Sequence, residues 1–184
     1  MNIHETELKG VFLIEPKVHG DQRGFFKETY SRRNFLDHGL DLDFVQDNAS
    51  LSSKGVLRGL HFQNPHSQGK LVQVALGEAL DVVVDIRPDS PTFGRGESFL
   101  LSSENHRQLY ISPGFAHGFL TLSEKALFVY KCTDFYHPES EHTLLWNDPA
   151  LGIEWPDMEF NVSEKDQAGL LLSDFSREEL EVAG

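Results

Sequence analysis

Short runs rich in Val, Ile, Leu, Phe and Tyr follow one another along most of this chain, separated by Gly, Pro, Ser and Asn. Runs of this length suit strands better than helices, and many such runs between frequent turn residues are typical of a sandwich or barrel. The sequence therefore predicts an all-β fold. The runs are 11–15, 24–30, 44–51, 55–63, 70–76, 78–87, 97–101, 107–111, 118–122, 125–136 and 143–146.

Two segments depart from this pattern and predict helices. Residues 31–39 begin with Ser31 as a candidate N-cap and end at Gly39, which suits a short helix. The segment 161–184 is acidic and indicates further helices or turns, with Ser163 and either Ser173 or Asp174 as caps. Because no internal repeat or linker interrupts the chain, we expect one domain spanning residues 1–184.

The run 78–87 shows the clearest alternation of side chains. One predicted face carries Leu80, Val82, Val84 and Ile86, and the other carries Asp81, Val83 and Asp85. Two acids beside a valine suit either a polar cavity or a solvent-exposed face, and the pattern alone leaves both open.

Charge and cysteine content narrow the class of protein. Acidic residues outnumber basic ones 29 to 16, giving a net charge of −13, so a nucleic-acid partner is not expected. The single cysteine, Cys132, cannot form a disulfide within the chain. The polar N-terminus lacks a signal-peptide pattern, and no apolar run approaches the roughly 20 residues of a membrane span. We therefore expect a cytoplasmic protein without a membrane partner.

The run GVLRGLHFQ (55–63) places Arg58 and His61 among core-type residues. In a regular strand, residues three apart point to opposite faces, so a shared cavity requires an irregularity, for which Gly59 is the natural place. His61 and His117 both lie near glycines in apolar contexts, although a lone buried histidine is more often structural. Neither forms an H-x-H pair, so a catalytic metal is not expected.

Three cations and one tyrosine are further candidates. Arg23, Arg58 and Lys70 lie at or inside strand-like runs of an acidic chain, which suits a local anion cradle. Tyr130 shares a predicted face with Phe128 and Cys132. Its hydroxyl suits either an ordinary packed tyrosine or a proton donor at a cavity wall.

Taken together and in order, these motifs resemble the dTDP-4-dehydrorhamnose 3,5-epimerase family. The resemblance covers nearly the whole chain, through DQRGFFKETY, FVQDNAS, GVLRGLHFQ, QGKLVQV, DVVVDIR, SPTFG, PGFAHGF, YKCTDFY, WNDP and SEKD. Three positions differ from the commoner family pattern: Cys132 replaces threonine, Ala49 a larger residue and Gly96 tryptophan.

The resemblance implies a cupin-type jelly-roll barrel, usually a homodimer, that needs neither metal nor cofactor. It implies inversion of carbons 3 and 5 in dTDP-4-dehydro-6-deoxy-D-glucose, giving dTDP-4-dehydro-L-rhamnose on the route to dTDP-L-rhamnose. The expected partner is thus a dTDP-linked 4-keto-6-deoxy sugar.

Individual roles also follow from the resemblance. His61 matches the base, Asp166 the acid that orients it, Tyr130 the proton donor, and Lys70, with Arg58, the cations near the developing oxyanion. Tyr136 matches an aromatic that stacks on thymine, and His117 is expected to pair with Asp81. The expected substrate-binding residues are Arg23, Phe26, Glu28, Gln46, Asn48, Arg58, Lys70, His117, Tyr136, Glu141 and Lys165.

Three alternatives remain open from the sequence. Relatives that invert only carbon 3 or carbon 5 share much of the same pattern. A metal-dependent cupin oxygenase and a non-catalytic sugar-binding barrel would also suit an all-β chain of this kind.

Overall fold

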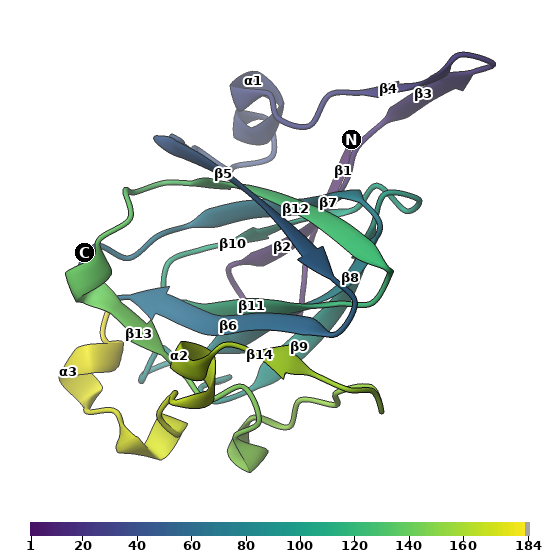
Figure 1. Cartoon of the computed structure of the whole chain (residues 1–184). Helices are drawn as coiled ribbons and strands as arrows, with labels where there is room; N and C mark the ends of the chain where they lie inside the picture. The colour runs from purple at the N-terminus through teal and green to yellow at the C-terminus, as the bar shows by residue number, and fades with distance from the viewer. Residues whose placement is uncertain (183–184) are drawn as a thin grey trace.

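Two stacked β-sheets form the body of the molecule (Figure 1). The computed structural model describes residues 1–182, so the last two residues of the predicted domain and C-terminal segment lie outside it. Sheet one contains, in spatial order, β1 (Asn2–Glu5), β2 (Val11–Glu15), β10 (Gln108–Ile111), β7 (Lys70–Leu76), β12 (Lys125–Cys132) and β5 (Gln46–Ser53). Sheet two contains β13 (Glu141–Thr143), β6 (Val56–Gln63), β11 (Phe115–Thr121), β8 (Glu78–Asp85) and β9 (Gly96–Ser102), with β14 (Asn161–Val162) parallel to β6.

This arrangement confirms the predicted jelly roll. Nearly every run expected from the sequence is a strand, and neighbours in a sheet come from distant parts of the chain. The sequence missed β1, whose side chains are mostly exposed and carry little alternation. It also missed β3 (Val18–Asp21), which pairs with β4 (Gly24–Lys27) rather than joining either sheet.

The two faces of β8 answer the question that its alternation left open. Val83 faces the interior between the sheets, where it joins the core around Phe128 and Leu109. Val82 and Val84 point to the opposite side, where the C-terminal part of the chain covers them with Leu172 and Phe175. Asp81 and Asp85 are both fully buried, so their face is not solvent-exposed.

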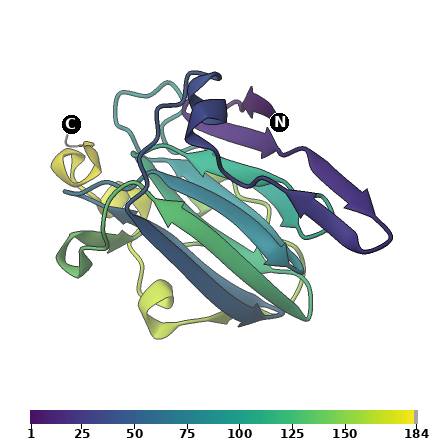
Figure 2. The same cartoon turned by 90° about the horizontal axis from the view of Figure 1, so that it is seen from above.

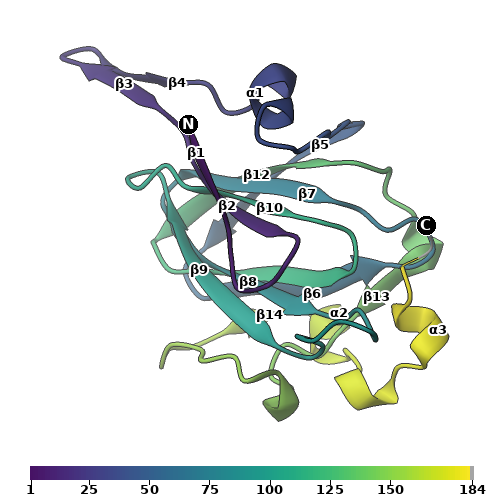
Figure 3. The same ribbon diagram turned by 180° about the vertical axis from the view of Figure 1, so that it is seen from behind.

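Short elements follow in the C-terminal part of the chain: η1 (Pro138–Ser140), η2 (Pro149–Leu151), α2 (Glu164–Gln167), η3 (Leu172–Asp174) and α3 (Arg177–Leu180). Of these, η2, η3 and α3 cover the outer face of sheet two with Leu151, Leu172 and Leu180 (Figure 3). Ser163 caps α2 as predicted. The cap predicted at Ser173 or Asp174 is wrong: Ser176 caps α3, because Glu179 completes a reciprocal capping box with it.

The predicted helix at 31–39 is present as α1 (Arg32–Leu36). Ser31 occupies the N-cap position without a side-chain hydrogen bond, and Gly39 follows the helix at φ +81°. In the described part of the chain, no helix is long and apolar enough to cross a membrane.

The β3–β4 hairpin projects from the barrel like an arm (Figures 1 and 2). Phe25 rests against His106 with ring centroids 4.6 Å apart. Phe26, which pairs with His19, remains 70% exposed. Phe25 and Phe26 thus leave two adjacent aromatic side chains largely exposed on the hairpin.

A break in strand register lies at Gly59, as the sequence predicted. His117 of β11 faces His61 of β6, whereas Phe119 faces Arg58, so two residues of β6 oppose one of β11. Gly59 has φ +114°, and a Cβ there would lie 2.7 Å from the Cα of Gly118. The irregular step turns Arg58 and His61 into the same cavity.

Candidate active site

A cavity of about 560 Å³ opens between the two sheets. Sheet two contributes Arg58, His61 and His117 to its wall, and sheet one contributes Lys70 and Tyr130. A second cavity of about 270 Å³ adjoins it and shares His61, Lys70 and Tyr130 with it. The two together form one elongated space with ionisable side chains at its centre.

His61 and Asp166 form a short polar contact in this space. The Nε2 atom of His61 lies 2.6 Å from Oδ1 of Asp166, and Asp166 is 4% exposed. Burial by itself would raise the pKa of Asp166. The hydrogen bond and charge of His61, with a bond from the Gly59 N–H, outweigh it, so the pKa lies below its usual value. Asp166 is therefore ionised at neutral pH and accepts the hydrogen bond from the imidazole.

The local fold around α2 places Asp166 there. Strand β14 runs parallel to β6 and delivers the chain beside it. The Oγ atom of Ser163 accepts a hydrogen bond from the Asp166 N–H, and the Gly59 N–H donates to Oδ2 of Asp166 over 3.4 Å. Asp166 is thus held from both sides, by a helix cap and by the irregular step of β6.

Lys70 and Tyr130 face His61 from the opposite sheet. Burial lowers the pKa of Lys70, and the nearby groups of Cys132, Glu141 and Asp81 partly oppose that effect. Burial also raises the pKa of Tyr130 above its ordinary value near 10, so its hydroxyl stays protonated at neutral pH. The cavity therefore has a histidine on one wall, and a lysine and a phenolic donor on the other.

His117 pairs with Asp81 as expected. Its Nε2 atom lies 2.9 Å from Oδ2 of Asp81, and both side chains are buried. Oδ1 of Asp81 has no hydrogen-bond partner. Both cavity histidines, His61 and His117, thus engage a carboxylate through Nε2.

The second cavity contains a connected set of polar groups. The hydroxyl of Tyr136 donates to Oε2 of Glu141 over 2.8 Å, and Lys165 forms an ion pair with the same oxygen. The Tyr136 N–H donates to Oε1 of Gln46, whose amide in turn donates to Asn48. These five residues, all predicted to bind substrate, therefore lie together.

Arg58 also lies at the cavity, with Nε donating to Oγ of Ser52 over 3.1 Å. Three other predicted binding residues do not line either cavity. Arg23 pairs with Asp21 on the projecting hairpin, Phe26 is exposed there, and Glu28 accepts a hydrogen bond from Asn34. Within one copy of the chain, the structure does not bring these three to the cavity.

Two residues that position the site were missed in the sequence. Ser163 was noted only as a helix cap, yet its Ser-x-x-Asp spacing fixes Asp166. Gln63 is 6% exposed, and its amide bonds the backbone of both His66 and Phe135. In the sequence, a glutamine at the end of an apolar run was the one available signal for that role.

Comparison with known proteins matches this geometry to a family. The family model for dTDP-4-dehydrorhamnose 3,5-epimerase matches residues 5–174. The Salmonella typhimurium dTDP-4-dehydrorhamnose 3,5-epimerase is 54% identical over 94% of this chain and 96% of its own. The chain belongs to the dTDP-4-dehydrorhamnose 3,5-epimerase family. This family membership excludes the alternatives of a metal-dependent cupin oxygenase and a non-catalytic sugar-binding barrel.

Solved structures of related epimerases agree with this assignment. The 3,5-epimerase of Legionella pneumophila Philadelphia 1, in complex with dTDP-4-keto-L-rhamnose, is 50% identical, with a TM-score of 0.95 over 100% of this chain and 98% of that chain. A 3′-monoepimerase of Streptomyces bikiniensis, in complex with dTDP-quinovose, is 37% identical, with a TM-score of 0.88 over 92% of this chain and 87% of that chain.

The three departures from the family pattern lie in different surroundings. Cys132 lines the second cavity and accepts a hydrogen bond from Asn48 through its sulfur. Ala49 is exposed on β5, away from both cavities. Gly96 lies against Ile153, where a Cβ would come within 2.8 Å. Only Cys132 of the three is therefore placed to affect substrate contacts.

Proposed function

We propose that this chain inverts carbons 3 and 5 of dTDP-4-dehydro-6-deoxy-D-glucose to give dTDP-4-dehydro-L-rhamnose, a step toward dTDP-L-rhamnose. The observation that carries the proposal is the placement of the His61–Asp166 pair and of Tyr130 on opposite sheets of one cavity. Epimerisation at carbon needs a base and an acid on opposite faces of the substrate. The two sheets supply those faces.

His61 acts as the base. A ketone at carbon 4 acidifies the protons on carbons 3 and 5, and imidazole is the side chain that most often acts as a general base. Asp166 holds the ring through Nε2 and stabilises the charge that forms on it. Its buried, hydrogen-bonded carboxylate serves this role better than an exposed one.

Lys70 and Tyr130 act on the enolate that results. Lys70, with Arg58, stabilises the developing oxyanion, a contribution of about 3–4 kcal/mol in comparable sites. Tyr130 then delivers a proton from the face opposite His61. Every role is filled by a protein side chain, so turnover should need no metal or cofactor, and dialysis against a chelator should leave it unchanged.

The second cavity binds the nucleotide. Tyr136 offers an exposed ring on which thymine stacks, and its hydroxyl bond to Glu141 fixes the ring's position. Gln46, Asn48 and Lys165 surround it with donors and acceptors. His117, buried against Asp81, lies on the sugar side of the cavity.

The active form is a homodimer in which each copy completes the other's cavity. Arg23, Phe26 and Glu28 are expected to bind substrate but lie on or just after the projecting hairpin. The Arg23 side chain is 84% exposed, with room for an anionic ligand beside its ion pair to Asp21. A hairpin from a second copy would bring all three to the diphosphate. The single domain and the cytoplasmic location expected from the sequence are part of this proposal.

Proton exchange in deuterium oxide tests the reaction. Incubation with dTDP-4-dehydro-6-deoxy-D-glucose should place deuterium at carbons 3 and 5, and NMR of the product should show both centres inverted. Absence of exchange at either carbon would contradict the proposal.

A single-carbon epimerase is the second candidate. The similarity to a 3′-monoepimerase favours it, since that protein shares the fold at 37% identity. Exchange and inversion at carbon 3 alone in the same experiment would establish this activity instead.

A further inference from the structure

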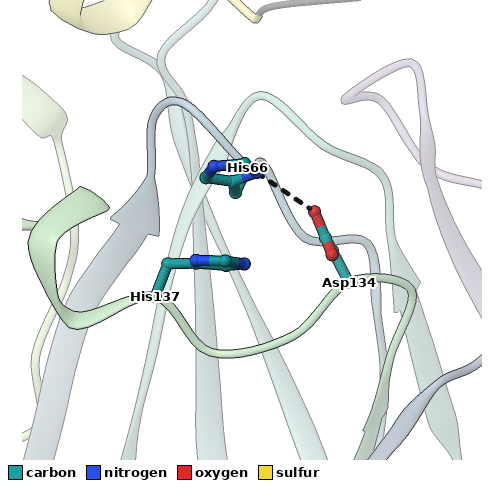
Figure 4. Close-up of side chains that lie close together, drawn as sticks. All are labelled: His66, Asp134 and His137. Carbon is teal, nitrogen blue, oxygen red and sulfur yellow. Dashed lines mark ion pairs between the residues drawn. The ribbon is translucent and has the colours of Figure 1, made fainter.

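Two histidines and an aspartate that the proposed chemistry does not use lie together at one end of the barrel (Figure 4). His66, Asp134 and His137 each offer one ligand atom, and these atoms lie within 4.8 Å of one another. Their side chains are 48%, 36% and 30% exposed, so an ion from solvent can reach all three. Among the described residues, no other group of three or more meets the same spacing.

The backbone holds these three residues in place. They lie on two neighbouring loops, 64–69 after β6 and 133–137 after β12. Gln63 donates to the carbonyls of His66 and Phe135 and accepts from the His137 N–H. Gln68 donates to the carbonyl of Asp134. These hydrogen bonds hold the two loops together without an ion.

The side chains are less constrained than the backbone, although Nδ1 of His137 lies 3.2 Å from Oε1 of the exposed Glu139. Oδ1 of Asp134 accepts from the Phe135 N–H, which leaves Oδ2 facing Nδ1 of His66 across 3.9 Å. The rings of His66 and His137 stack with centroids 4.0 Å apart. His66 has φ +68°, a backbone conformation that side-chain-bearing residues seldom adopt. Two imidazoles and one carboxylate therefore lie close together. No direct hydrogen bond joins any two of them.

We propose that His66, Asp134 and His137 bind one divalent transition-metal ion of the zinc type. Imidazole nitrogens with a carboxylate oxygen suit zinc, nickel and copper rather than magnesium or calcium. Ligand atoms around tetrahedral zinc lie about 3.4 Å apart, from bond lengths near 2.1 Å. Rotation of the side chains closes the present spacing, and it also turns the stacked rings so that both nitrogens point at the ion. Water completes the shell.

The ion's place in the fold defines its effect. It joins loop 64–69 to loop 133–137 outside the substrate cavity. Tyr136 lies in the chain between the ligands Asp134 and His137, so a bound ion restricts the loop that carries it. The role is structural, and the reacting atoms do not contact the ion.

Zinc titration of the full-length protein tests this site without measuring turnover. Protein freed of metal by chelator dialysis is titrated with zinc chloride in competition with a chromophoric chelator. The wild type should bind one equivalent, and saturating zinc should raise Tm by about 5 °C. His66→Ala and His137→Ala should each weaken binding at least about tenfold and reduce the Tm rise.

Two variants separate this site from other histidines. His4→Ala removes an exposed histidine of β1, and His61→Ala removes the histidine beside Asp166; both should keep wild-type affinity. Wild-type binding in His66→Ala and His137→Ala, or no binding by the wild type at millimolar zinc, overturns the proposal. If either variant misfolds by circular dichroism, histidine-ring NMR of the zinc-titrated wild type decides: shifts confined to His66 and His137 support the site, and shifts elsewhere reject it.

Discussion

Oδ1 of Asp166 lies 2.6 Å from Nε2 of His61, although the two residues are 105 positions apart in the chain. Asp166 itself is held by Ser163 and by the Gly59 N–H. A histidine and a buried carboxylate in this relationship act as a unit, because the carboxylate fixes the ring and stabilises its protonated form.

The loss from removing both residues should therefore be far from additive. His61→Ala should abolish deuterium exchange at both carbons, and Asp166→Ala should lower its rate at least about 10²-fold. The double variant should be little worse than His61→Ala. Glu164→Ala, in the same helix but exposed, is the matched control and should keep wild-type exchange. Additive losses would place Asp166 outside the catalytic unit.

Tyr130→Phe should separate exchange from inversion. The change keeps the ring and deletes the donor, while His61 and Lys70 still allow the enolate to form. The enolate then takes a proton back from the His61 side. To the extent that His61 trades its proton with solvent before returning it, NMR in deuterium oxide should show residual exchange with little inversion at carbon 5. Epimerisation at the wild-type rate would instead make Tyr130 an ordinary packed tyrosine.

The fall of kcat/KM at alkaline pH should reflect the deprotonation of Lys70. Burial lowers the pKa of Lys70 and raises that of Tyr130, so Lys70 is the first of the two to lose its proton as pH rises. Its charged form stabilises the oxyanion, and activity should therefore fall as pH rises through that lowered pKa. In Lys70→Arg the guanidinium stays charged above pH 12, so the remaining activity should lose this limb. An unchanged limb in Lys70→Arg would assign it to another group.

Arg23→Ala should raise KM more than it lowers kcat, since it removes binding present in both ground and transition states. If the hairpin serves the second copy, mixing Arg23→Ala with His61→Ala should restore activity. A mixed dimer then has one cavity with both defects and one intact cavity, so about a quarter of all cavities regain wild-type KM after random exchange. No recovery after proven subunit exchange would mean that Arg23 serves its own chain or none.

Gly59→Ala should destabilise the fold and impair the site together. A Cβ at this position meets the Cα of Gly118 at 2.7 Å, in addition to the strain of φ +114°. We expect a loss of at least about 2 kcal/mol in unfolding free energy by urea titration. Gly39→Ala is the control, because its φ is +81° but nothing lies within 4 Å of the added Cβ. Gly39→Ala should lose less unfolding free energy than Gly59→Ala, and the difference between the two measures the effect of the close approach of β11.

The sequence by itself determined the strands and much of the site. Backbone geometry makes side chains alternate along any strand, so the shared face of Phe128, Tyr130 and Cys132 was readable locally, as was the irregular step at Gly59. The resemblance to epimerases was carried by ordered motifs and needed no contacts. What could be predicted was therefore either local in the chain or written in residue identity.

Only the tertiary structure decided which distant residues meet. Asp166 reads as an exposed helical acid until β14 pairs with β6 and buries it beside His61. The sequence leaves open whether the face of β8 with Asp81, Val83 and Asp85 meets solvent or a cavity, and only the stacking of the two sheets encloses it in the interior. Arg23 and Phe26 read as residues of a binding strand, yet their hairpin leaves the barrel. These outcomes depend on packing between segments far apart in sequence, which alternation and capping do not encode.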